Sequence, residues 1–288
     1  MRRKKKLVIL AHNYQRSEIQ RTADFRGDSL DLARKATEVD AEIIVFCGVV
    51  FMAETAKILN PQKKVLIPDS NAGCALADTI TVEELKEAKR KYDNPVVVSY
   101  INTYASVKAE SDICCTSANA VKVIDSIPKN KKILFTPDRN LGRYVSKASN
   151  RELILWDGFC YVHDYLTEGD VEEAKREHPS AKLCCHPECR EEVVAHADLV
   201  ASTNGMVRYA KEVDELIIGT ETGLGERINI DFGKKVYPLN TNAICATMKL
   251  ITLDKLCWSI ENEKYEIRLD DDILSNAKEP LEKMLQIV

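Results

Sequence analysis

The chain has 288 residues, of which 45% are hydrophobic and 30% are charged, and its formal net charge at pH 7 is −4. At about 150 residues per domain, this length predicts about two domains with sizeable buried cores. No segment approaches the roughly 18 apolar residues of a membrane span, and the basic run Arg2 to Lys6 is interpreted as a solvated start. The composition, net charge and short apolar segments therefore exclude a membrane protein and disfavour a nucleic-acid partner.

Ten cysteines occur without a secretory signal. This combination predicts a reducing, cytoplasmic location, where thiols bind metals, catalyse reactions or fill cores and seldom form disulfides. Some of the ten are therefore expected to be metal ligands.

The first 80 residues contain three apolar runs that favour strands. These runs are residues 7–10, 42–48 and 64–68. The polar triplet His12-Asn13-Tyr14 follows the first run, and a segment from Asp24 to Ser29 precedes an amphipathic stretch at 29–39 that favours a helix. One cysteine, Cys74, lies just beyond the third run.

Residues 81–166 repeat this pattern after a helix expected at 81–92, where a threonine cap precedes an acidic first turn. The apolar runs are residues 96–100, 132–136 and 152–156. The triplet is now Tyr100-Ile101-Asn102, the acidic-to-hydroxyl segment runs from Asp112 to Ser117, and the cysteine is Cys160.

Residues 167–260 repeat the pattern again, with a helix expected at 167–178. The apolar runs are residues 181–185, 215–219 and 235–239. The triplet is His186-Pro187-Glu188, the acidic-to-hydroxyl segment runs from Asp198 to Thr203, and the cysteine is Cys245. Residues 261–288 are expected to form a capping helix that is interrupted near Pro280.

The spacings between equivalent features agree: 88 and 86 residues for the triplets, and 86 and 85 for the cysteines. This agreement predicts a triplication. Strands that alternate with helices favour parallel βαβ units. The expected α/β fold is three pseudo-threefold-related αβα sandwiches with mainly parallel sheets around a common centre, and no linker separates them.

Ligands of open parallel sheets bind beyond the carboxyl ends of the strands, where all these features fall. Three thiolates on a threefold axis, from Cys74, Cys160 and Cys245, can cap one Zn or hold three corners of a 4Fe-4S cluster. Both options stay open at this point. Either metal group would keep one coordination position free, which favours a catalytic Lewis acid over a purely structural metal site.

The stretch "CCHPEC" at residues 184–189 raises an alternative metal site. Cys184 and Cys185 are neighbours in a strand, so their side chains point to opposite faces and cannot chelate one ion together. A Zn site of Cys185, His186 and Cys189 is disfavoured because no second cysteine pair completes a tetrahedral set. We interpret Cys184 and Cys185 as core thiols, together with Cys47, Cys114 and Cys115.

The remaining polar residues at the strand ends are candidates for substrate binding and proton transfer. Around the open metal position we expect His12, Tyr14, Tyr100, Asn102, His186 and Glu188, residue types that can move protons at a desolvated site. The hydroxyl residues Ser29, Ser117, Ser202 and Thr203 are interpreted as helix N-caps whose helix starts attract phosphate or carboxylate. These helix starts predict a small substrate with several negative charges. Nucleotide binding is disfavoured because no Walker or GxGxxG motif occurs.

At these residues the chain resembles the quinolinate synthase family of NAD biosynthesis. The stretches that carry the resemblance are "LAHNYQ", "GDSLDLARKA", "FMAETAKILNP", "TSANAV", "PDRNLGRYV", "CYVH", "HPEC", "ASTNGMVRYA" and "IGTETGL". The resemblance implies a 4Fe-4S cluster on Cys74, Cys160 and Cys245, with the fourth iron binding substrate. It also implies that iminoaspartate condenses with dihydroxyacetone phosphate to give quinolinate, phosphate and water.

Carried over residue by residue, Tyr14, Tyr100, His186 and Glu188 would be catalytic. The substrate-binding residues implied are His12, Ser29, Tyr100, Asn102, Ser117, His186, Glu188, Ser202 and Thr203. A functional link to the enzyme that supplies iminoaspartate is expected. The chain departs from the family at Phe159, where a histidine is expected, and lacks both a C-terminal cysteine triplet and a longer N-terminal helix, so an edge of the first sheet is expected to be uncovered.

Two other functions remain open from the sequence. One is a hydro-lyase of another small hydroxy acid that uses the same open iron. The other is a non-catalytic metal sensor that binds a partner or DNA, against which the acidic net charge and the His, Tyr and Glu set both argue.

Overall fold

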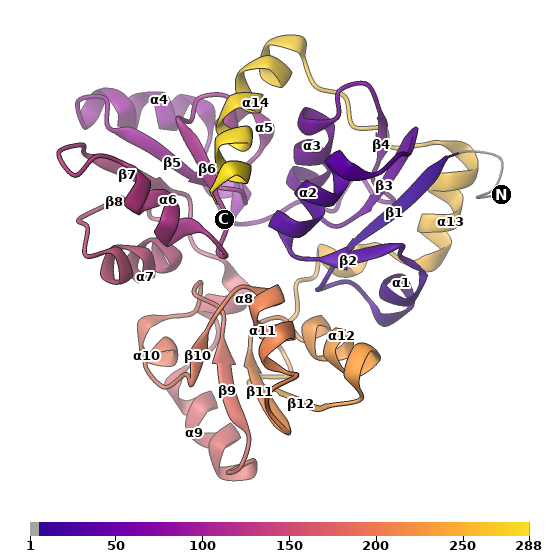
Figure 1. The fold of residues 1–288 in the computed structure, drawn as a ribbon, viewed down its shortest axis with the longest axis vertical. Coiled ribbons are helices and arrows are strands. Elements are labelled where there is room, and N and C mark those ends of the chain that lie inside the picture. Colours follow the sequence, from indigo (N-terminus) through magenta and orange to yellow (C-terminus); the bar gives the residue numbers. More distant parts are fainter. Residues whose placement is uncertain (1–5, 288) are drawn as a thin grey trace.

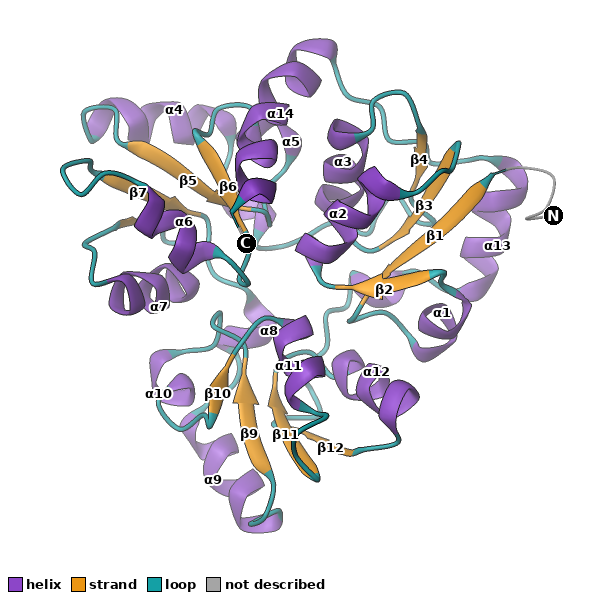
Figure 2. Ribbon diagram, in the orientation of Figure 1, coloured by secondary structure: helices purple, strands orange, loops and turns teal. Residues whose placement is uncertain are grey.

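The computed structural model describes residues 6–287, so Arg2 to Lys5 of the basic run lie outside the described residues. Three four-stranded sheets, all parallel, radiate from a common centre, and helices flank each sheet (Figures 1 and 2). The predicted α/β class and the three αβα sandwiches are confirmed.

The three sheets share one strand order. In the first sheet, β1 and β3 are central, and the order is β2-β1-β3-β4; the equivalent orders are β6-β5-β7-β8 and β10-β9-β11-β12. The bounds are β1 Leu7–His12, β2 Phe25–Gly27, β3 Ile43–Cys47, β4 Lys64–Leu66, β5 Val96–Tyr100, β6 Ile113–Cys115, β7 Ile133–Thr136, β8 Ile154–Leu155, β9 Lys182–Cys185, β10 Leu199–Val200, β11 Glu215–Gly219 and β12 Lys235–Pro238. The central strands are mostly apolar runs rich in Val, Ile and Leu, as parallel strands covered on both faces require, although β9 is Lys-Leu-Cys-Cys.

The helices cover the faces of these sheets. Their bounds are α1 Ser17–Thr22, α2 Ser29–Glu38, α3 Val50–Leu59, α4 Val82–Lys91, α5 Ala105–Lys108, α6 Ala120–Ser126, α7 Arg139–Ser149, α8 Tyr161–Asp164, α9 Glu168–Glu177, α10 Glu191–Val194, α11 Thr203–Tyr209, α12 Gly223–Phe232, α13 Leu253–Asn262 and α14 Asp271–Gln286. Two short 3-10 turns, η2 Ala77–Thr79 and η3 Met248–Leu250, follow the cysteines of the first and third units.

The acidic residue that opens each acidic-to-hydroxyl segment has the same structural task in all three units. The carboxylates of Asp24, Asp112 and Asp198 accept the backbone N–H groups of Ile9, Val97 and Leu183 at 2.8, 2.7 and 2.9 Å. Each aspartate thereby ties a short strand, which the sequence analysis did not predict, to the central strand beside it. The same contact therefore recurs in all three units.

Equivalent threonines cap the helix that follows each cysteine loop. The side chains of Thr81, Thr167 and Thr252 accept N–H bonds from the third residue of α4, α9 and α13. Helix α4 begins the second unit and α9 the third, whereas α13 returns to the first (Figure 1). There the Lys255 ammonium pairs with Asp69 at 2.5 Å.

The segment after α13 covers the first sheet at β4. Tyr265 O accepts the Ile67 N–H at 3.0 Å, and Ile267 N–H donates to Val65 O at 2.8 Å. Because Glu266 also forms an antiparallel bridge with Leu66, the uncovered edge expected from the sequence is not found at β4.

Helix α14 is continuous through Pro280, so the expected interruption there is wrong. Its Ala277, Leu281 and Met284 side chains are buried, and it contacts α3, α5 and β6. This packing joins the first two units and holds the helix together although Pro280 lacks an N–H group. Among the described residues, no helix has the length and apolar character needed to cross a membrane.

Candidate functional site

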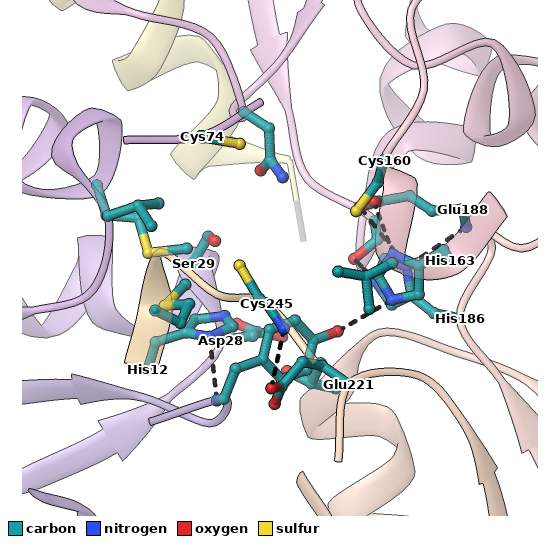
Figure 3. Close-up of a pocket in the computed structure, with 18 of the residues that line it drawn as sticks. His12, Asp28, Ser29, Cys74, Cys160, His163, His186, Glu188, Glu221 and Cys245 are labelled. Carbon is teal, nitrogen blue, oxygen red and sulfur yellow. Dashed lines mark hydrogen bonds and ion pairs between the residues drawn. The ribbon is translucent and has the colours of Figure 1, made fainter. Parts of the chain in front are cut away.

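The carboxyl ends of the central strands of all three units meet at one pocket (Figure 3). Its lining includes His12, Tyr14, Ser29, Cys74, Tyr100, Asn102, Ser117, Cys160, His186, Glu188, Thr203 and Cys245. All the site residues proposed from the sequence, except Ser202, thus line one pocket. Parallel strands that point the same way in each of three units bring residues from the whole chain together here.

Cys74, Cys160 and Cys245, one from each unit, present their sulfur atoms to this pocket (Figure 3). All ten cysteines are free thiols. Burial raises the pKa of Cys74 to about 12, and it also raises that of Cys160 and Cys245. The charge of Glu188, and then those of Cys74 and Cys245, raise the pKa of Cys160 further. Metal binding would displace the thiol protons.

The spacing of these sulfurs tests which metal group they fit. Thiolates around one tetrahedral Zn at about 2.3 Å lie roughly 3.8 Å apart. In the described part of the chain, the three sulfurs do not form a group whose ligand atoms all lie within 4.8 Å of one another. As placed, at least two of these sulfurs are therefore farther apart than two thiolates on a single Zn.

A second candidate metal site overlaps the first. Cys160, His163 and Glu188 place their ligand atoms within 4.8 Å of one another, and this is the one such group among residues 6–287. No such group forms around Cys185, His186 and Cys189, so the disfavoured Zn site is not found. Cys189 instead donates its thiol to Gly219 O at 3.2 Å, while Cys47, Cys114, Cys115, Cys184 and Cys185 are buried in cores.

His12 and His186 occupy equivalent turns at the ends of β1 and β9. In each turn the backbone N–H two residues later donates to the Nδ1 atom of the imidazole, from Tyr14 at 3.2 Å and from Glu188 at 3.3 Å. Each ring therefore carries its proton on Nε2. Burial lowers the pKa of both histidines to about 3, so they are neutral hydrogen-bond donors toward the pocket.

Glu188 is the hub of the polar network. The Tyr100 hydroxyl donates to its Oε1 atom at 2.5 Å, and His163 Nδ1 lies 3.0 Å from its Oε2 atom. Burial alone would raise the pKa of Glu188, but the two neighbouring imidazoles and these hydrogen bonds outweigh it and lower the pKa. A buried carboxylate thus stays ionised at the pocket wall.

His163 is a site residue that the sequence analysis did not single out. Its Nδ1 atom lies 3.0 Å from Glu188 Oε2, and its Nε2 atom lies 2.8 Å from the Thr220 hydroxyl oxygen. Its ring also stacks on His186 with centroids 4.6 Å apart. The available signal was its position one helical turn after Cys160 in "CYVH".

Tyr14 extends this network into the first unit. Its hydroxyl lies 2.5 Å from Thr220 Oγ1, which makes a continuous chain from Tyr14 through Thr220 and His163 to Glu188. Burial, and then the charge of Glu188, raise the pKa of Tyr14 well above its ordinary value, so this hydroxyl keeps its proton. Groups from two units can therefore exchange a proton without bulk water.

The hydroxyl residues differ from their predicted role as N-caps. Only Ser202 is a cap, accepting the Gly205 N–H, whereas Asp28 caps α2 and Asn119 precedes α6. Ser29 is the first residue of α2, and Ser117 lies in the turn before α6.

The hydroxyls nevertheless connect the units. Ser117 Oγ lies 3.1 Å from His186 Nε2, Ser202 donates to Asp28 at 3.1 Å, and Thr203 Oγ1 accepts from the Asn13 side chain at 2.9 Å. The buried Asn102 Oδ1 atom has no hydrogen-bond partner, as expected of a polar group that awaits a ligand.

Comparison with known proteins gives a consistent result over the whole chain. The family described as "Quinolinate synthetase A protein" matches residues 1–286. A quinolinate synthase of Desulforudis audaxviator is 50% identical over 290 residues, which is all of this chain and 96% of the relative. A quinolinate synthase of Pyrococcus furiosus is 48% identical, with 100% and 95% covered, and "Quinolinate synthase 2" of Methanosarcina acetivorans is 44% identical, with 100% and 93% covered. The chain belongs to the quinolinate synthase family of enzymes.

Proposed function

We propose that this enzyme condenses iminoaspartate with dihydroxyacetone phosphate to form quinolinate, phosphate and water, in the cytoplasm and as a step of NAD biosynthesis. We further propose that Cys74, Cys160 and Cys245 hold one 4Fe-4S cluster. The observation that carries this proposal is that one sulfur from each unit faces a single pocket, at a spacing too wide for one Zn. Three protein ligands leave one iron open, and when bound that iron supplies Lewis-acid chemistry.

Glu188 is the proposed proton acceptor of the reaction. It is ionised, buried, and bonded to Tyr100 and His163, so it can take a proton from bound substrate and share it with its neighbours. Tyr14 lies at the far end of the chain through Thr220 and His163, and is the proposed donor that returns a proton to a leaving hydroxyl. Tyr100 holds the Glu188 carboxylate in place.

The neutral rings of His12 and His186 are proposed to bind substrate oxygens through their Nε2–H groups. Asn102, whose side-chain oxygen lacks a partner, is proposed to accept a hydrogen bond from substrate. Ser29, Ser117 and the Ser202–Thr203 pair stand before or at the start of three helices, so their hydroxyl and N–H groups suit carboxylate or phosphate. Holding both small anions in one pocket converts their encounter into a positioned reaction.

The same enclosure protects an unstable substrate. His12, Tyr14, Tyr100, His186 and Glu188 are each less than 10% exposed, so little water reaches the reacting groups. Iminoaspartate hydrolyses readily, which supports both this enclosure and a functional link to the enzyme that supplies it. We expect the three units to move apart to admit substrate and to close upon it.

Product detection tests the proposed function. Enzyme purified without oxygen is supplied with both substrates, and quinolinate is measured for the wild type and for Cys74→Ser, Cys160→Ser and Cys245→Ser. We expect quinolinate from the wild type, and loss of both iron and product in each variant. A wild type that carries four irons but dehydrates another hydroxy acid, and forms no quinolinate, would favour the hydro-lyase instead.

A further inference from the structure

The three cysteine loops are held by one backbone bond that is repeated in every unit. The N–H groups of Val50, Arg139 and Thr222 donate to Ala72 O, Gly158 O and Ala243 O at 2.8, 2.8 and 3.0 Å. Each acceptor lies two residues before the cysteine of its loop. The residues immediately before the three donors are therefore structurally equivalent, and they are Val49, Asp138 and Glu221.

Two of these three equivalent residues are fully buried carboxylates, and each contacts the cysteine of its own unit. Asp138 Oδ2 accepts the Cys160 N–H at 3.1 Å, and Glu221 Oε1 accepts the Cys245 N–H at 3.2 Å. In the first unit the same position is Val49, whose side chain has no acceptor atom.

Both carboxylates use their second oxygen to hold the helix that follows the strand. Asp138 Oδ1 accepts the Leu141 N–H at 2.7 Å at the start of α7, and Glu221 Oε2 accepts the Gly223 N–H at 2.7 Å at the start of α12. Lys249 neutralises Glu221 at 2.9 Å. Each carboxylate therefore links a strand end, a helix start and a cysteine through two separate acceptor atoms.

Helix capping alone does not require a buried carboxylate here. Serine, threonine or asparagine caps a helix with one acceptor, and burying a charged group costs free energy unless its partners compensate. What a carboxylate adds is a second acceptor atom, and in both units that atom is occupied by the N–H of the cysteine.

We propose that Asp138 and Glu221 are positioning residues of the metal centre, each fixing the backbone of one ligand cysteine, Cys160 or Cys245. This inference rests on the proposed function, because it assumes that the two cysteines are ligands. Groups that orient metal ligands govern how tightly the metal is held, and their loss typically lowers affinity or activity by about 10- to 100-fold.

The substitutions that test this keep as much of the fold as the chain allows. Asp138→Ser retains an oxygen that can cap α7 but cannot also reach the Cys160 N–H. Glu221→Gln keeps the size of the side chain. Its amide NH₂ group must replace one of the two acceptor oxygens, so either the Gly223 N–H or the Cys245 N–H loses its acceptor. Thr167→Ala is the matched control, because it removes a helix cap from α9 without touching a cysteine loop.

The readouts are the rate at which anaerobic, cluster-loaded protein loses iron to a chelator, and the electron paramagnetic resonance spectrum of the reduced cluster. We expect iron loss about 10-fold faster in Asp138→Ser and Glu221→Gln, with altered spectra, whereas Thr167→Ala matches the wild type. Wild-type rates and spectra in both variants would overturn the inference. Iron loss that merely follows reduced thermal stability in all three would overturn it too. An iron-free wild type would instead overturn the proposed function, and this inference with it.

Discussion

The first and third units end their leading strands in the same turn but place opposite chemistry on it. In both, a histidine accepts the N–H of the residue two positions later, and burial keeps its ring neutral. That later residue is Tyr14 in the first unit, which keeps its proton, and Glu188 in the third, which is ionised. One backbone geometry thus carries the proposed acid in one unit and the proposed base in another.

The cysteine loops diverge in a parallel way. Cys160 and Cys245 have a carboxylate on their backbone N–H, whereas the equivalent position near Cys74 is Val49. The first unit is reinforced from outside instead, where α13 and residues 265–267 bond to it. Equivalent loops are therefore supported by different interactions, and the following variants test how far the equivalence extends.

The largest expected effect is a loss of kcat that differs between the strand-end turns of the first and third units. Glu188→Gln should lower kcat by about 10³-fold because it removes the ionised acceptor, while Tyr14→Phe should lower it by about 10²-fold. Both are measured by quinolinate formation at equal cluster content. Substantial activity in Glu188→Gln, with Tyr14→Phe inactive, would reverse the assignment of base and acid.

The aspartate anchors test what the units share. Asp24→Ala, Asp112→Ala and Asp198→Ala each leave a strand N–H without its acceptor, which should cost about 1–3 kcal/mol of unfolding free energy. Urea denaturation should show similar losses for all three. Asp40→Ala, at an exposed pair with Lys6, is the control and should change stability little. If one of the three substitutions leaves the unfolding free energy unchanged, the aspartate of that unit does not have the same structural role as the other two.

The threonine caps test whether α13 completes the first unit as α4 and α9 begin theirs. Thr81→Ala, Thr167→Ala and Thr252→Ala should each cost about 1 kcal/mol. Hydrogen exchange should locate the Thr252→Ala loss in α13 and at the β4 edge. If protection from exchange drops in the third sheet instead, α13 stabilises the third unit and not the first.

The smallest effect is a pH dependence in the third unit. Burial alone would raise the pKa of Asp198, but the Leu183 N–H and Lys182 lower it below its ordinary value. The ionised form therefore stabilises the fold above about pH 4, and this contribution is lost as pH falls through the folded-state pKa. Asp198→Asn should be less stable than the wild type at pH 7, with the gap narrowing by pH 3. A gap independent of pH would show that charge plays no part.

Much of this architecture followed from the sequence because three copies of each feature reinforced one another. Cys74, Cys160 and Cys245 could be singled out among ten cysteines because they share one period with the strands, the polar triplets and the hydroxyl residues. The edge strands β2, β6 and β10 were missed since they are two or three residues long and owe their pairing to Asp24, Asp112 and Asp198. Their stability comes from a tertiary contact, which local patterns do not reveal.

His163 was missed for the opposite reason, since it has no equivalent in the other two units. The residues three positions after Cys74 and Cys245 are Ala77 and Met248. Repetition cannot identify a residue that only one copy carries. Asp138 and Glu221 were hidden likewise, because the equivalent position in the first unit is Val49. Residue propensity alone predicts a break in α14 at Pro280. The helix is continuous because it packs against the first two units, and a local sequence pattern does not reveal that packing.

Whether three cysteines hold one cluster is tested by the metal and sulfide content of anaerobically purified Cys74→Ser beside the wild type. The two candidate sites differ here, because Cys74 belongs to the three-sulfur set but not to the group of Cys160, His163 and Glu188. We expect about four irons and about four sulfides per chain in the wild type, and loss of the intact cluster in Cys74→Ser. A single metal ion per chain, without sulfide and unchanged in Cys74→Ser, would contradict it.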